Sequence, residues 1–108
     1  MKSDRLENMI KGWFVGNFDP VVLRNENFEV AVKYYKAGDC EETHYHKIAT
    51  EVTVIVSGTV EMCGKIWEAG DIVVVEPGEA TGFHALTDSV NVVVKTPSAP
   101  NDKYIATV

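Results

Sequence analysis

The sequence predicts an all-β domain that folds as a sandwich or a closed barrel. From residue 28 to residue 35, Phe28, Val30, Val32 and Tyr34 fall on one face and the residues between them on the other, the two-residue period of a strand. About eight such short segments follow one another at intervals of roughly 8–12 residues, and turn residues, mostly glycine or proline, stand at the breaks. The 108 residues leave room for one domain with its own core.

Residues 1–27 are expected to form an N-terminal extension that packs on the barrel or on a dimer partner. Apolar residues recur at helical spacing between residues 5 and 14. Gly12 and Gly16 weaken a helix there, so a single helical turn leading into an extended segment fits equally well. Residues 21–23 are expected to form a brief strand.

The barrel itself is expected between residues 28 and 96, with turn residues bounding each strand. Cys63-Gly64 is a two-residue hairpin connection whose glycine supplies the positive φ that such a turn needs. Pro97 opens a C-terminal tail, residues 97–108. The expected strands are residues 28–35, 44–46, 51–57, 59–62, 65–68, 72–75, 81–86 and 90–96.

Two of these strands are apolar on both faces, at residues 52–56 and 90–94. One face of each strand lines the interior, and the other also requires cover. A homodimer, in which a second copy supplies that cover, is the expected assembly.

Composition excludes several classes of function. The 10 basic and 16 acidic residues give a net charge of −6 with no basic run, which argues against nucleic-acid binding. No stretch of about 18 apolar residues could span a membrane. The first eight residues are too polar for a signal peptide, and two cysteines make no disulfide framework, so a cytoplasmic setting is expected.

His44 and His46 are the strongest candidates for function. Side chains two positions apart on an extended segment point to the same side, with anchor points roughly 6.6 Å apart. Both rings can therefore bind one metal ion. Glu51 would add a carboxylate oxygen, and this set of ligands suits iron, manganese, nickel or zinc. Counted along the strand, Glu51 has the opposite parity to the histidines, so a bend at residues 47–50 must turn it inward.

The same stretch resembles the first sequence motif of the cupin superfamily. Gly38, five residues, His44-x-His46, four residues, Glu51, six residues and Gly58 follow that motif without a gap. The resemblance implies a cupin-type double-stranded β-helix, or jelly-roll, barrel. It also implies a divalent metal held by the two histidines and the glutamate.

The second cupin motif is matched only loosely. It runs glycine, five residues, proline-x-glycine, two residues, histidine, three residues, asparagine. Here Pro77 comes one residue late and Gly78 follows it directly. His84 lies seven residues past the proline instead of five, and Asp88 falls where the asparagine would be. We expect His84 as a fourth metal ligand, because Gly82 on the same strand face leaves room beside it. If His84 points away, an open site of two histidines and one carboxylate remains, or binding fails.

The resemblance implies a metal-binding protein that acts on a small polar metabolite, as a dioxygenase or an isomerase. One alternative is a non-catalytic module that binds a metabolite. Another is a metal-free isomerase or epimerase of sugars with a histidine as base. The sequence leaves these open, and it does not identify the substrate.

Overall fold

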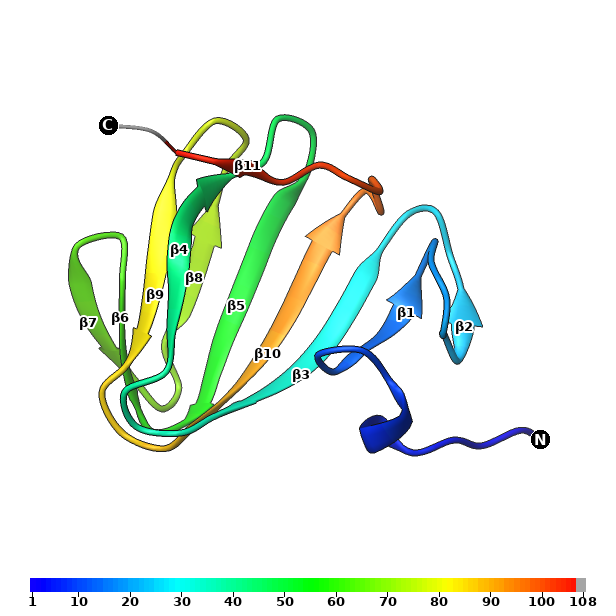
Figure 1. The fold of residues 1–108 in the computed structure, drawn as a ribbon, viewed down its shortest axis with the longest axis horizontal. Coiled ribbons are helices and arrows are strands. Elements are labelled where there is room, and N and C mark those ends of the chain that lie inside the picture. The colour runs from blue at the N-terminus through cyan, green and yellow to red at the C-terminus, as the bar shows by residue number, and fades with distance from the viewer. Residues whose placement is uncertain (107–108) are drawn as a thin grey trace.

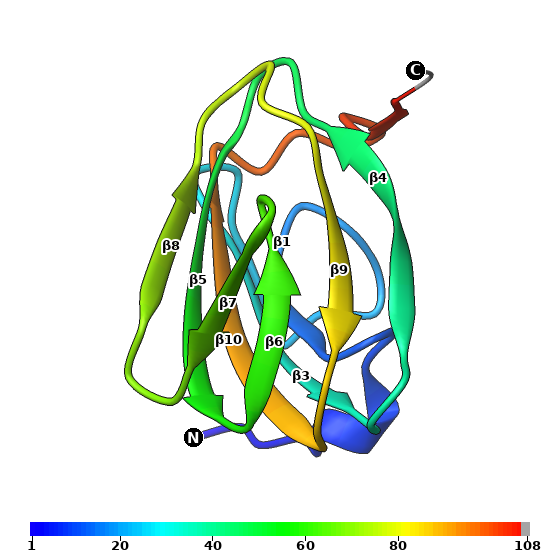
Figure 2. The same cartoon turned by 90° about the vertical axis from the view of Figure 1, so that its left-hand side faces the viewer.

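The structure is a computed structural model that describes residues 1–106, and it consists of two β-sheets packed face to face (Figures 1 and 2). The elements in chain order are a 3-10 turn η1 (Leu6–Asn8) and the strands β1 (Trp13–Gly16), β2 (Leu23–Arg24), β3 (Glu29–Tyr35), β4 (Cys40–Tyr45), β5 (Thr50–Ser57), β6 (Thr59–Met62), β7 (Lys65–Glu68), β8 (Ile72–Val75), β9 (Thr81–Ala85), β10 (Ser89–Thr96) and β11 (Tyr104–Ile105). The predicted all-β jelly-roll class is confirmed.

The larger sheet has the order β2-β1-β3-β10-β5-β8, and the smaller has the order β11-β4-β9-β6-β7. Neighbouring strands are antiparallel except β1 and β2, which are parallel. In Figure 2 the two sheets face each other, with β8 and β5 on one side and β9 and β4 on the other. None of the helices within residues 1–106 is long and apolar enough to cross a membrane.

The N-terminal segment joins the larger sheet as strands β1 and β2, after the single turn η1. Gly12 lies so close to β3 that an added Cβ would fall 1.9 Å from the carbonyl oxygen of Val32. The Val32 N–H donates to the Gly12 carbonyl oxygen at 3.1 Å. Glycine is therefore required where the chain turns into β1. Of the two alternatives for this segment, the single turn leading into an extended segment is the one that forms, and the helix between residues 5 and 14 does not.

The strand expected at residues 44–46 begins earlier, because β4 starts at Cys40. Its early residues pair with β9 (Cys40 with His84 and Glu41 with Phe83), a contact between distant parts of the chain. The expected tail also contains β11, which pairs with the other edge of β4. Residues 107 and 108 of that tail lie outside the described part. The remaining expected strands are confirmed within one or two residues.

The larger sheet turns its more polar face inward. On β3 the residues Glu29 and Ala31 are buried, and Lys33 and Tyr35 of the same face line a cavity between the sheets. An apolar cluster fills one part of the interior: Ile55, Val60, Met62, Val73, Val75, Phe83 and Ala85, with Tyr35 and Trp67 packed against it. The opposite, outward face of this sheet carries valines in register across its central strands.

Candidate functional site

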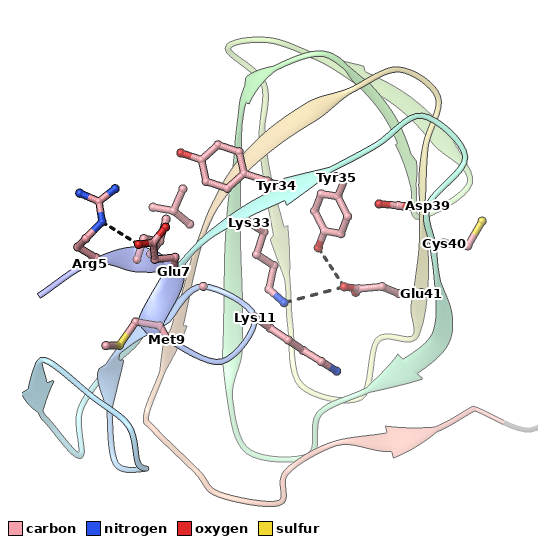
Figure 3. A pocket seen from close by; sticks show the side chains of 13 residues that line it. Arg5, Glu7, Met9, Lys11, Lys33, Tyr34, Tyr35, Asp39, Cys40 and Glu41 are labelled. Atoms are coloured by element: carbon pink, nitrogen blue, oxygen red, sulfur yellow. Dashed lines mark hydrogen bonds and ion pairs between the residues drawn. The ribbon is translucent and has the colours of Figure 1, made fainter.

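A cavity of about 190 Å³ lies between the two sheets. Its polar lining consists of Lys11, Lys33, Tyr35, Glu41, His44, Glu51, Thr53, Thr81, Asn91, Lys95 and Lys103. Four of these residues, Lys11, Lys33, Tyr35 and Glu41, also line a larger groove of about 740 Å³ between η1, β3 and β4 (Figure 3). The cavity therefore adjoins a groove at the surface, with these four side chains between them.

The two histidines of the motif lie side by side at one end of β4. The ring centres of His44 and His46 are 5.3 Å apart and the rings are nearly perpendicular. His44 belongs to β4 and lines the cavity, whereas His46 follows the last residue of the strand and is only 4% exposed. A spacing of roughly 5 Å between ring centres is compatible with two imidazoles bound to one ion at about 2.0–2.1 Å.

Both imidazoles can present an unprotonated Nε2. His44 Nδ1 lies 2.9 Å from the backbone oxygen of Glu42, and donation of the Nδ1 proton there leaves Nε2 free. His46 Nε2 is buried with no hydrogen-bond partner in the described chain. Burial, helped by the charge of Lys95, lowers the pKa of His46 to about 4. His46 is therefore neutral at pH 7, as a metal ligand must be.

Glu51 opens the inner face of β5 and lines the same cavity as His44. It pairs in register with Lys95 of β10, and Lys95 pairs with Glu29 of β3 on its other side, so a row of alternating charge crosses the sheet. Burial raises the pKa of Glu51, while Lys95 and His44 act against that rise.

The donor types suit a divalent metal, but their side chains do not converge fully. Within residues 1–106, no three His, Cys, Asp or Glu side chains are grouped so that they could hold a metal ion. The fold assembles the imidazole pair and places Glu51 on the wall of the same cavity. A complete ligand set requires the Glu51 carboxylate to come within bonding distance of that pair.

The structure does not bring His84 to this site. Thr81, Phe83 and Ala85 of β9 are buried, whereas His84 belongs to the opposite face, where it pairs with Cys40 and Glu61. Both of these neighbours are exposed.

Thr81 occupies the place where the second cupin motif has its histidine. Counted from Gly70, the motif glycine falls on Gly78 and the histidine on Thr81, while Glu76 replaces the proline. Both glycines have positive φ, at 95° and 86°. The Thr81 hydroxyl accepts a hydrogen bond from the Cys63 N–H at 2.9 Å and donates to the Gly82 carbonyl oxygen at 2.8 Å. This hydroxyl is thus engaged with backbone.

Asp102, which the sequence analysis did not single out, fixes the segment that follows His46. Its carboxylate accepts the backbone N–H groups of Lys47, Ile48 and Ala49 at 2.9–3.3 Å. Burial acts to raise the pKa of Asp102, but these hydrogen bonds outweigh it and hold the pKa below its ordinary value. No sequence motif signals this role, because the partners lie more than fifty residues away.

A second set of polar side chains, Lys33, Tyr35 and Glu41, lies between the cavity and the groove (Figure 3). The Tyr35 hydroxyl donates to Glu41 Oε1 at 2.9 Å, and Lys33 Nζ lies 3.9 Å from the same oxygen. Glu41 and His44 have opposite parity on β4, yet both line the cavity, because the register shifts between them. Burial lowers the pKa of Lys33 and raises that of Tyr35.

Comparison with known proteins gives matches among solved structures alone. No family model matches the chain, and no curated protein does. An uncharacterized conserved protein with a double-stranded β-helix domain from Klebsiella pneumoniae is 23% identical, with a TM-score of 0.69 over 76% of this chain and 72% of that one. An RmlC-like cupin from Shewanella frigidimarina is 24% identical, with a TM-score of 0.63 over 72% of each chain.

The fold is that of the cupins. Oxalate decarboxylase from Bacillus subtilis, a protein with Mn(II) centres, also superposes, at 20% identity and a TM-score of 0.62 over 74% of this chain and 24% of that one. At these identities the likeness shows the fold alone.

Proposed function

We propose that this chain binds a small polar metabolite in the cavity between its sheets, next to a divalent metal ion held by His44, His46 and Glu51. The observation that carries the proposal is the buried Nε2 of His46, which has no partner in the described chain. A buried polar atom without a partner costs free energy, and a metal ion would satisfy it. The Mn(II) centres of a structural neighbour support the same choice.

The ion is iron, manganese, nickel or zinc, and the reaction is of dioxygenase or isomerase type. When bound, such an ion polarises a substrate oxygen or carries redox chemistry. Thr81 adds no ligand because its hydroxyl is engaged with backbone, so coordination positions stay open for substrate.

The chain's own residues would bind the metal ion and the substrate. Glu51, on the wall of the same cavity, would serve the metal ion as an ionised carboxylate. The Tyr35 hydroxyl and the Lys33 ammonium are directed toward Glu41 at the junction with the groove, where a ligand would enter (Figure 3). The apolar cluster beyond them excludes water from one side of the cavity.

A second candidate is a metal-free cupin that binds a metabolite without catalysis, or that isomerises a sugar with a histidine as base. The specific observation in its favour is that no three metal-binding side chains within residues 1–106 are grouped into a site. In this case His46 Nε2 would meet a hydroxyl group of the ligand.

Elemental analysis of protein purified without chelator separates the two candidates. We expect close to one equivalent of divalent metal in the parent and His84→Ala proteins. We expect little metal in His44→Ala or His46→Ala, and weaker retention in Glu51→Gln. Metal-free parent protein, or equal metal in all four variants, would overturn the metal proposal in favour of the second candidate.

A further inference from the structure

The cavity concentrates positive charge in an acidic protein. Four of the ten basic residues line it, Lys11, Lys33, Lys95 and Lys103, against two carboxylates, those of Glu41 and Glu51. Because the chain as a whole carries a net charge of −6, this excess of lysine belongs to the cavity and not to the general surface. Such a site attracts anions.

Two of these lysines are held in place by an aromatic ring. Lys33 Nζ lies 5.1 Å and Lys95 Nζ 4.8 Å from the centre of the Trp13 ring. Their side chains are 14% and 17% exposed. Partly desolvated ammonium groups that are fixed in this way bind an anion more strongly than mobile surface lysines do.

Neither the Lys33 nor the Lys95 ammonium group is within hydrogen-bond distance of the carboxylate it pairs with. Lys33 lies 3.9 Å from Glu41, and Lys95 lies 3.8 Å from Glu29. These separations are longer than a hydrogen bond, and each ammonium has three donors. Donors therefore remain for a ligand.

Asn91 supplies an independent sign of a ligand in the same place. Its side chain lines the cavity, is 2% exposed, and has an oxygen with no hydrogen-bond partner in the described chain. Asn91 is the direct register partner of Lys33 across β3 and β10. An unpartnered amide oxygen requires a donor, such as a hydroxyl group.

We propose that the ligand is a small hydroxylated anion, a carboxylate or a phosphate ester, whose charge binds Lys33 and Lys95 and whose hydroxyl group donates to Asn91. The cavity volume of about 190 Å³ corresponds to about six water molecules at ~30 Å³ each, so the ligand is small unless it extends into the groove. This inference names the substrate class of the proposed function and rests on the cavity being its ligand site.

The test uses the full chain after chelator treatment, so that a metal ion cannot bind the anion directly. Affinities are measured by calorimetry for malate, succinate, glycerol 3-phosphate and glycerol. We expect malate or glycerol 3-phosphate to bind, succinate (which has no hydroxyl group) to bind more weakly than malate, and glycerol not to bind. Which of the two hydroxylated anions binds better identifies the carboxylate or the phosphate ester.

Variants assign the binding to the named residues. Lys33→Gln and Lys95→Gln should each weaken anion binding by about tenfold or more, because each removes a charged donor. Lys33→Arg, which keeps the charge, should retain most of the affinity, and Lys65→Gln on the exposed strand β7 should leave it unchanged. Asn91→Ala should reduce the preference for malate over succinate.

Anion affinities within twofold of the parent in both Gln variants, or no preference for any anion over glycerol, would overturn this inference. Metal content, measured separately, tests the proposed metal site. If the protein holds no metal but still binds anions through its lysines, the proposed substrate class stands and the proposed metal site fails. If it holds metal but does not bind anions through its lysines, the metal site stands and the substrate class fails.

Discussion

The protonation of His46 couples the stability of the folded protein to pH. The His46 ring is nearly inaccessible, its Nε2 has no partner in the described chain, and its pKa is lowered to about 4, chiefly by burial. The folded protein therefore holds the neutral ring, whereas the unfolded chain protonates it near pH 6.5. This stabilisation is complete above pH 6.5 and is lost as the pH falls toward 4.

We predict that chelator-treated parent protein loses about 3 kcal/mol of unfolding free energy between pH 7 and pH 4, relative to His46→Gln. Urea unfolding at the two pH values measures this quantity in both proteins. Comparison with the variant is needed because Glu51, whose pKa is raised by burial, gains stability as the pH falls. Parallel pH profiles for the two proteins would contradict a depressed pKa at His46.

The C-terminal segment holds β4, the strand that carries His44, in position. Strand β11 pairs with β4, Tyr104 stacks on Tyr45 with ring centres 5.4 Å apart, and Lys47 Nζ lies 4.2 Å from the centre of the Tyr104 ring. Together with Asp102, these contacts fix both sides of His46.

We predict that Asp102→Ala lowers the unfolding free energy by about 2–4 kcal/mol, because three backbone N–H groups lose their acceptor. It should also weaken metal retention, since the segment that follows His46 is released. Asp71→Ala is the matched control, because Asp71 accepts a single N–H from Glu68 at an exposed turn. Urea unfolding compares the variants, and equal losses in both would refute the role given to Asp102.

The strands could be predicted where local sequence decides them. Turn residues, mostly glycine and proline, located β6 to β10 closely, because such residues act through their own φ preferences. The start of β4 and the whole of β11 depend on pairing with distant strands, which leaves no local signal. The inward face of β3 could not be predicted from its alternation, because the face with Lys33 and Tyr35 lies inward and the more apolar face lies outward.

The candidate site could be predicted only in part for the same reason. His44 and Glu51 were predicted from the motif, and both line the cavity. The lysines and Asn91 come from strands with ordinary alternation, so only the register between strands shows that they meet. Thr81 was not predicted, because the displaced Pro77 of the second motif placed the expected histidine at His84.

The outer face of the larger sheet is apolar. Two complete rows cross four strands in register: Val30, Val94, Val52 and Val74, and beside them Val32, Val92, Val54 and Ile72. Ile72 is 61% and Val74 51% exposed. We propose that a second copy of the chain covers this face, because rows without charge are complementary to themselves and not to a charged partner.

We predict that the protein sediments as a dimer and that Val54→Lys, in the middle of this face, shifts it toward monomer. Lysine would place a charge in the apolar contact, where it has no partner. Glu61→Lys on the exposed face of β6 is the control and should stay dimeric. A monomeric parent in analytical ultracentrifugation would refute the proposed assembly.

The most direct test of the metal centre is a crystal structure of the protein loaded with Mn²⁺, with the ion located by its anomalous scattering. We predict one peak in the cavity, within bonding distance of Nε2 of both His44 and His46 and of the Glu51 carboxylate, with none at His84. An ion bound elsewhere, or a fully loaded crystal in which His46 Nε2 still has no partner, would contradict the proposed centre.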